Sequence, residues 1–161
     1  MQYHIPGGGI AIAPAQVSNM TVTVFGCSSF LGRYVINALA KTGAQIVCPF
    51  RCDELDVQHL KVNGDLGQLV LYPGFDIRND EMLDHAISKS NVVINLIGSW
   101  RETWNYSFKD VHVGLTRRVA EAVKRADHVE RFLHFSCIGA RPDAPGERMI
   151  TKVRYITISI N

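Results

Sequence analysis

The residues best suited to chemistry form a short turn between an apolar segment and an amphipathic one. Gly26 and Gly32 enclose the sequence Cys27-Ser28-Ser29-Phe30-Leu31. A strand, a tight turn of small residues and a helix N-terminus together present free N–H groups to a pyrophosphate. The turn therefore predicts a dinucleotide site, and a purely structural strand-to-helix turn is the alternative. The predicted contacts are Gly26, Ser28, Ser29, Phe30, Leu31 and Gly32.

Two glycines of this turn have separate predicted roles. Gly26 permits the tight turn, and Gly32 lets the helix pack close to the strand. Ser29 occupies the middle position of the pattern Gly-x-x-Gly-x-x-Gly, so a Cβ must fit where the backbone approaches phosphate. Serine is small enough for nucleotide binding to survive.

A basic residue follows the second predicted strand. Arg51 lies near the position, about 20 residues beyond the turn, where an acidic residue holds the ribose 2′-hydroxyl in an NAD site. A guanidinium there suits a 2′-phosphate, because it binds phosphate with bidentate, charge-assisted geometry. Arg51 therefore predicts NADPH rather than NADH, and a solvated surface arginine beside Asp53 and Glu54 is the alternative.

Later strand ends supply further candidates. Asp76 follows the third predicted strand and is placed to accept a hydrogen bond from the adenine amino group, unless it is simply a turn residue. The fourth predicted strand ends in Leu96, Ile97 and Gly98, and Gly98 lets a ligand approach the backbone. All these positions lie at the carboxyl edge of a sheet, where open α/β folds bind ligands.

The residues needed for hydride transfer are incomplete. A short-chain dehydrogenase needs a tyrosine acid four residues before a lysine, with a serine that orients the substrate. Ser136 and Lys152 are candidates for the serine and the lysine. Arg148 stands at the tyrosine position, and Tyr155 is followed four residues later by Ser159. The sequence therefore predicts no catalytic residue.

The candidates require a sheet with covering helices to bring them together. Short apolar runs alternate with longer amphipathic ones from Thr21 onward, which is typical of βαβ units and a parallel sheet. The expected fold class is α/β, a Rossmann-type doubly wound parallel sheet. Strands are predicted over 21–25, 45–48, 68–71, 91–97 and 131–136, and helices up to about 41, after Asn79 or Asp80, and over 111–123. The tail 154–161 alternates isoleucine with threonine and serine, which predicts a half-buried strand.

Composition excludes several classes of protein. The 161 residues are 47% hydrophobic and 20% charged, which is typical of one globular domain. A net charge of +2 gives no reason to expect nucleic acid, and no run approaches the roughly 18 apolar residues of a membrane span. The cysteines and histidines show neither disulfide nor metal-ligand spacing. We expect an irregular arm over 1–19, without the basic residues of a targeting segment, then a dinucleotide-binding domain over 20–152 and a tail over 153–161.

Two features of the sequence have more than one interpretation. The loop with Trp100, Trp104, Tyr106 and Phe108 can cover a pocket, anchor a protein interface, or place two or three aromatic rings on the core. Cys27 can be a redox thiol at the helix N-terminus, although a small buried cysteine is the simpler interpretation.

The chain from about Met20 to Lys152 resembles the short-chain-dehydrogenase-like accessory subunit of mitochondrial respiratory complex I. The segments that carry the resemblance are 23–35, 49–53, 59–69 and 91–98. The most specific runs are Gly64-Asp65-Leu66-Gly67-Gln68, Asn95-Leu96-Ile97-Gly98 and Trp100-Arg101-Glu102-Thr103.

The resemblance implies a non-catalytic subunit that supports assembly of complex I. It implies a location on the matrix side of the inner membrane, in the peripheral arm near the membrane arm, with a bound NADPH that does not turn over. The expected partners are other complex I subunits. The family's nucleotide contacts correspond to Gly26–Gly32, Arg51, Asp76 and Leu96–Gly98.

This chain departs from the family at two places. Ser29 replaces a glycine beside the phosphates, and the chain ends soon after the fifth predicted strand, where the family continues. The expected domain is thus C-terminally truncated: a reduced member, part of a split subunit or an incomplete sequence. Its exposed sheet edge needs cover from a partner. The alternatives are an NADPH-dependent reductase or epimerase, and a scaffold that has lost the nucleotide.

Overall fold

A five-stranded parallel sheet organises the chain. The structure, a computed structural model, describes residues 19–158, with only the backbone of 154–158. The strand order is β3-β2-β1-β4-β5, so the first strand lies at the centre. This arrangement confirms the expected doubly wound α/β fold. The strands are β1 (Thr21–Phe25), β2 (Gln45–Pro49), β3 (Leu69–Tyr72), β4 (Val92–Asn95) and β5 (Arg131–His134).

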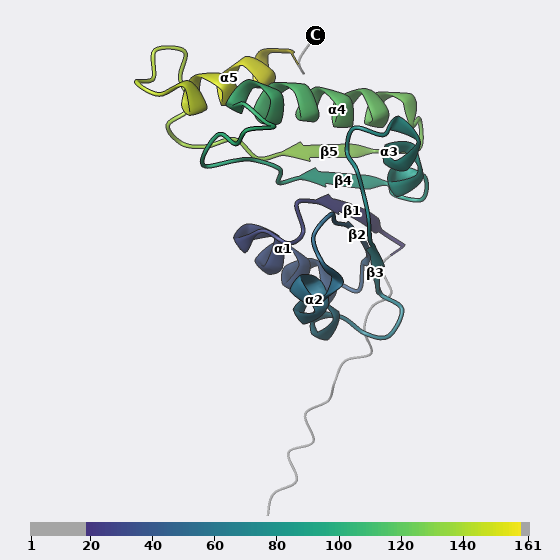
Figure 1. The fold of residues 1–161 in the computed structure, drawn as a ribbon. Helices are drawn as coiled ribbons and strands as arrows, with labels where there is room; N and C mark the ends of the chain where they lie inside the picture. The colour runs from purple at the N-terminus through teal and green to yellow at the C-terminus, as the bar shows by residue number, and fades with distance from the viewer. Residues whose placement is uncertain (1–18, 159–161) are drawn as a thin grey trace, which may run out of the picture.

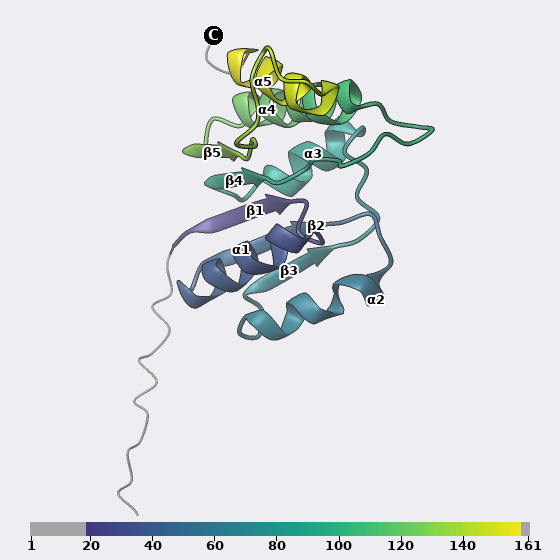
Figure 2. The ribbon, with the colours of Figure 1, turned by 90° about the vertical axis from the view of Figure 1, so that its left-hand side faces the viewer.

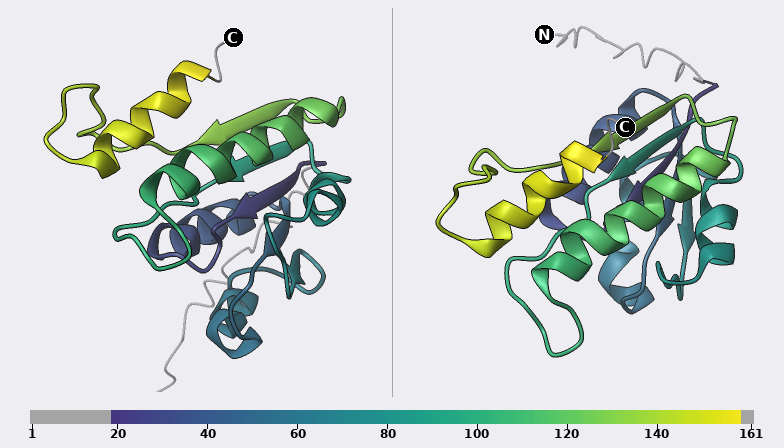
Figure 3. Two further views of the ribbon diagram at one scale, coloured as in Figure 1. Left: turned by 45° about the horizontal axis from the view of Figure 1, so that its top comes forward. Right: turned by 90° about the horizontal axis from the view of Figure 1, so that it is seen from above.

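Helices cover both faces of this sheet (Figures 1 and 2). One face carries α1 (Phe30–Lys41), α2 (Glu54–Val57) and the 3₁₀ helix η1 (Gln58–Asn63). The other carries α3 (Asp80–Ile87) and α4 (Thr116–Arg125), which continues the π-helix η2 (Asp110–Leu115). The last helix, α5 (Glu147–Ile158), lies beside the start of the η2–α4 helix (Figure 3).

The central strand is buried on both faces, as expected for a parallel sheet covered on each side. Val22 and Val24 belong to the core beneath α1, whereas Phe25 belongs to the core beneath α3 and α4. Thr23 is fully buried, and its hydroxyl donates to the Ala86 carbonyl at 2.8 Å. This bond ties the strand to the end of α3.

The observed strands differ from the predicted ones mainly at their ends. β4 and β5 end at Asn95 and His134, two residues earlier than predicted. At β4 the Asn95 side chain accepts the Ile97 N–H at 3.0 Å, which takes this N–H out of the sheet ladder. α3 begins as predicted, because Asn79 caps it by accepting the N–H groups of Glu81 and Met82.

The strand predicted over 154–161 is wrong as far as the structure describes it. Residues up to Ile158 belong to α5, and 159–161 lie outside the described residues. The first turns of α5 are already anchored by tertiary contacts. The Thr151 hydroxyl lies 3.0 Å from His112 Nδ1, and Lys152 Nζ donates to the Phe135 carbonyl. A helix nucleated in this way continues into the alternating residues despite their β-branched side chains.

Residues 19–158 lack two kinds of feature. Within that range no helix is long and apolar enough to cross a membrane. The same residues contain no group of histidine, cysteine and carboxylate side chains that could hold a metal ion. The arm expected over 1–19 lies outside the described residues except for Asn19.

Candidate functional site

The turn between β1 and α1 has the close packing that its two glycines predict. Gly26 has a φ of +82°, and a Cβ there would lie 3.1 Å from the Leu96 carbonyl carbon. A Cβ on Gly32 would lie 2.7 Å from the Gly26 carbonyl oxygen and closer still to that of Cys27. Both positions therefore need glycine, one for the turn and one for the approach of helix to strand.

Ser29 fits this turn by capping the helix. Its φ of −71° is an ordinary value for serine, and its Oγ accepts the Gly32 N–H at 3.0 Å. The Ser29 N–H in turn donates to the Gly26 carbonyl at 3.1 Å. Serine is thus compatible with the local backbone and satisfies one N–H group of the helix N-terminus.

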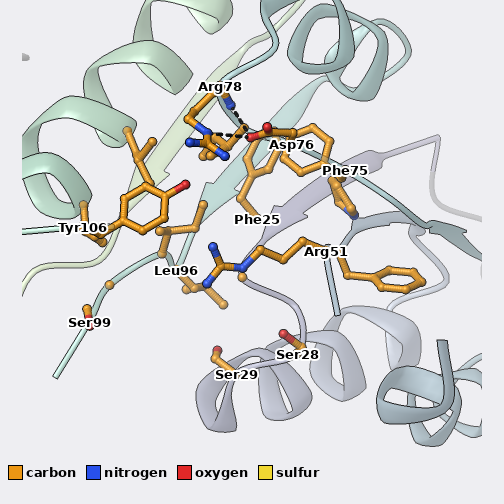
Figure 4. Close-up of a pocket in the computed structure, with 18 of the residues that line it drawn as sticks. Phe25, Ser28, Ser29, Arg51, Phe75, Asp76, Arg78, Leu96, Ser99 and Tyr106 are labelled. Atoms are coloured by element: carbon orange, nitrogen blue, oxygen red, sulfur yellow. Dashed lines mark hydrogen bonds and ion pairs between the residues drawn. The ribbon is translucent and has the colours of Figure 1, made fainter. Parts of the chain in front are cut away.

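A cavity of about 510 Å³ opens at the carboxyl edge of the sheet (Figure 4). It lies beyond the end of β1, between β2 on one side and β4 on the other. This is the switch point of a doubly wound sheet. Most of the predicted site residues line it together: Gly26, Ser28, Ser29, Arg51, Asp76, Leu96, Ile97 and Gly98.

Five predicted residues lie outside the cavity lining. Phe30 and Leu31 are exposed on α1, and Gly32 is buried beneath the turn. Ser136 is exposed just beyond β5. Lys152 lies next to Gly98 of the cavity lining, since a Cβ on Gly98 would come within 3.2 Å of its Nζ. Their nucleotide contacts stay predictions.

Asp76 is held by the residue two positions later. Its Oδ1 accepts the Arg78 backbone N–H at 3.0 Å and the Arg78 Nε–H at 3.3 Å. The backbone hydrogen bond, followed by the Arg78 side chain, lowers the pKa of Asp76. The carboxylate is therefore negative at neutral pH, and its contact with adenine stays a prediction.

Sequence reasoning missed Arg78 and gave Tyr106 no definite place. Both line the cavity, and the Arg78 guanidinium lies 5.5 Å from the Tyr106 ring centroid. The Arg51 guanidinium lies 5.9 Å from the same centroid, and Arg51 is an exposed residue of the cavity lining, so its contact with a 2′-phosphate stays a prediction. The spacing of Arg78 from Asp76, at the same strand end, was the available signal.

The loop that carries Tyr106 leaves its tryptophans outside the core. Tyr106 and Thr103 form a short antiparallel bridge that folds the loop back on itself. Trp100 is 85% exposed and stacks under the Arg148 guanidinium at 4.4 Å, and Trp104 is fully exposed. Neither tryptophan therefore packs on the core, whereas Tyr106 and Phe108 are half-buried and Phe108 stacks on the buried His112 ring.

A buried histidine joins the cavity rim to α5. His112 Nε2 accepts the N–H of Ser99, which lines the cavity, at 3.2 Å, and Nδ1 pairs with the Thr151 hydroxyl. Burial, followed by the nearby charge of Lys152, lowers the pKa of His112 to about 4. The imidazole is therefore neutral at physiological pH and acts as a structural link.

Cys27 is the small buried residue that the simpler interpretation expects. Its thiol donates to the Pro49 carbonyl at 3.4 Å. The buried Cys48 thiol is its neighbour, and hydrogen bonding between the two lowers the pKa of Cys27 and raises that of Cys48.

The turn, the cavity and the strand order agree with a comparison to known families. The profile of the NAD dependent epimerase/dehydratase family matches residues 22–156. The chain belongs to this family.

Two curated proteins are more than 40% identical to this chain over most of its length. The mouse protein named NADH dehydrogenase [ubiquinone] 1 alpha subcomplex subunit 9, mitochondrial, is 44% identical over 148 residues, which is 86% of this chain and 39% of the mouse protein. The Neurospora crassa NADH-ubiquinone oxidoreductase 40 kDa subunit, mitochondrial, is 47% identical over 140 residues, 87% of this chain and 36% of that protein. The chain thus spans less than half the length of these relatives.

Solved structures of more distant proteins share the fold. A UDP-glucuronic acid 4-epimerase from Bacillus cereus, in complex with NAD, has a TM-score of 0.69 at 18% identity and covers 86% of this chain, with 51% of its own chain matched. A short-chain type dehydrogenase/reductase from Mycobacterium ulcerans has a TM-score of 0.70 at 21% identity. The match covers 86% of this chain and 59% of that chain. These similarities support the Rossmann-type architecture.

Proposed function

We propose that this chain is the nucleotide-binding portion of an accessory subunit of mitochondrial complex I and that it holds NADPH as a non-catalytic ligand. The names of the mouse and Neurospora crassa relatives support the complex I role. The observation that carries the nucleotide proposal is the cavity that joins the Gly26 turn to Arg51 at the switch point.

The cavity fits the parts of a phosphorylated dinucleotide. Its volume of about 510 Å³ is in the range of cofactor sites. The Gly26 turn and the twelve-residue α1 offer N–H groups and a positive dipole end to the pyrophosphate. Arg51 supplies the guanidinium for the 2′-phosphate, and Leu96 to Gly98 supply the backbone wall toward the nicotinamide. Phe30, Leu31, Gly32, Ser136 and Lys152 lie outside the cavity lining, and in this assignment they stay predicted nucleotide contacts.

The polar groups near the cavity support a non-catalytic role. A bound nicotinamide supplies the hydride chemistry, and the chain would have to supply a proton. Arg148 stands at the place of the tyrosine acid; its guanidinium stacks on Trp100 and does not release a proton at neutral pH. Lys152 donates to the Phe135 carbonyl, and burial lowers its pKa. These residues hold α5 and the cavity wall in place.

The last strand of the described sheet has an open edge with exposed apolar side chains. Among the described residues β5 pairs only with β4, which leaves its second edge without a strand neighbour. Leu133 on β5 and Phe135 just beyond it are 47% and 42% exposed. An apolar strand edge of this kind needs cover. Further residues of the polypeptide or a neighbouring subunit can supply that cover. The proposed partners, named from the relatives, are other complex I subunits in the peripheral arm near the membrane arm, on the matrix side of the inner membrane.

The test is to isolate the tagged chain with its native assembly, denature it and quantify NADP(H) and NAD(H) per chain. Near-stoichiometric NADP(H) that co-purifies with complex I is expected. The variant Arg51→Gln should lose NADP(H), whereas Arg125→Gln, which removes an exposed α4 arginine paired with Asp84, should keep it. An empty wild-type site points to a scaffold, and consumption of NADPH with a carbonyl substrate points to a reductase.

A further inference from the structure

Two arginines from different strand ends share one aromatic ring. Arg51 follows β2, and Arg78 follows β3 just beyond Asp76. Their guanidinium carbons lie 5.9 Å and 5.5 Å from the centroid of Tyr106, which belongs to the loop after β4. Figure 4 shows Arg51 and Arg78 beside Tyr106 within one cavity.

The hydrogen bonds of Arg78 leave its outer donors available to a ligand. Its backbone N–H and its Nε–H both go to Asp76 Oδ1. An arginine has five N–H donors in a planar fork, so the four on the two terminal nitrogens are not used by this pair. The Asp76 bonds fix the stem and tilt of the guanidinium while its outer edge remains in the cavity.

The charges around this ring favour an anion. Arg51 and Arg78 are the basic residues of the cavity lining, and Asp76 is its acidic residue. The single negative charge of Asp76 does not neutralise the two positive charges of the guanidiniums beside the Tyr106 ring. A phosphomonoester carries between one and two negative charges at pH 7 and three acceptor oxygens, so it complements this arrangement in charge and in donors.

We infer that Arg78 is a second ligand of the adenosine 2′-phosphate and that Tyr106 holds Arg51 and Arg78 in the arrangement that selects it. This inference rests on the proposed NADPH site and deepens it. Two guanidiniums then bind one phosphate from two sides, with the aromatic ring as their common support. The selectivity for NADPH over NADH resides in these three residues rather than in Arg51 alone.

A purely structural role for Arg78 predicts a different effect of its substitution on dinucleotide affinity. If Arg78 serves only its ion pair with Asp76, the pair is an exposed one of little energetic value. Removing the guanidinium would then change NADPH and NADH affinities equally. The ratio of the two affinities separates the two roles.

The experiment measures dissociation constants of NADPH and NADH by calorimetry with the full chain. For Arg78→Gln we expect NADPH affinity to fall about 10- to 100-fold, the range for loss of a charge-assisted contact, with NADH affinity unchanged. Arg125→Gln, the matched change on α4, should leave both constants unchanged. The probes 2′-AMP and 5′-AMP should repeat the contrast, because only the first carries the 2′-phosphate.

Two further variants keep the inference testable if Arg78→Gln does not fold. Arg78→Lys retains the charge but not the fork, and should lose part of the NADPH selectivity. Tyr106→Leu retains both arginines without their common ring, and should also lower the ratio of NADPH to NADH affinity. An unchanged ratio in folded Arg78 variants would overturn this inference alone, whereas failure of wild-type chain to bind either dinucleotide would overturn the proposed function.

Discussion

Acidification should destabilise the chain through His112. This imidazole is 2% exposed, and its pKa falls from an ordinary value of 6.5 to about 4 on folding. The folded state therefore disfavours the proton that the unfolded state accepts. The stabilising contribution is fully present above pH 6.5 and is lost as the pH falls from there toward 4.

The magnitude follows from that change in pKa. Each pKa unit corresponds to about 1.4 kcal/mol, so the full change is worth about 3 kcal/mol. Solvent in the adjoining cavity screens part of it, which leaves an expected loss of about 1–3 kcal/mol. Protonation also abolishes the acceptor for the Ser99 N–H and places a cation near Lys152. This is a large fraction of the roughly 5–15 kcal/mol that stabilises a domain.

The assay is urea unfolding followed by circular dichroism at several pH values between about 7 and 4. His134 also has a pKa lowered to about 4 by burial, so wild-type data alone do not isolate His112. The variant His112→Gln keeps an acceptor and a donor without a titrating ring. The difference in unfolding free energy between wild type and variant should shrink by about 1–3 kcal/mol over this range. A difference that is independent of pH would refute the reasoning.

Three substitutions test the packing around the site by urea unfolding at neutral pH. Ser29→Ala removes the cap of α1 and should lower the unfolding free energy by about 1 kcal/mol. Gly32→Ala should lower it by about 1–2 kcal/mol, since overpacking against two backbone carbonyls exceeds the gain in helix propensity. Thr23→Val should cost about 1–3 kcal/mol, because the Ser90 hydroxyl and the Ala86 carbonyl lose a buried partner.

Each substitution has its own contradicting outcome. If the Ser29→Ala variant is as stable as wild type, water replaces the cap. Gly114→Ala is the matched control for Gly32→Ala, because a Cβ at Gly114 meets no atom closer than 4.0 Å; equal effects at the two glycines would contradict the packing argument. Unchanged stability of the Thr23→Val variant would show that the buried hydroxyl pair contributes nothing net.

The periodicity of the sequence was sufficient to predict the strands of the sheet. Apolar runs of four to seven residues predicted every strand close to its observed position, because the inner strands of a covered parallel sheet need continuous apolar side chains. The helix cap at Asn79 was also predictable, since its amide is a local signal. The tail was not, because its helix depends on contacts of Thr151 and Lys152 with distant elements.

The candidate site was predictable where it depends on strand ends. Parallel strands bring their carboxyl ends to one edge, which placed Arg51, Asp76 and Gly98 around one cavity. The contribution of Tyr106 depends on how a long loop folds back, and no local pattern specifies that path. Arg78 was missed in the sequence analysis because a charged residue in a turn is usually solvated.

The position of β1 at the centre of the sheet has a consequence for folding kinetics. β1 pairs with β2 early in the chain, with Thr21 opposite Gln45, but its other edge waits for β4, where Val92 pairs with Val22. Closing the longer loop costs more entropy than closing the shorter one. We expect the β1-α1-β2 unit to form first and docking of β4 to limit the folding rate. Until then one edge of β1 is exposed to chaperones and to other chains.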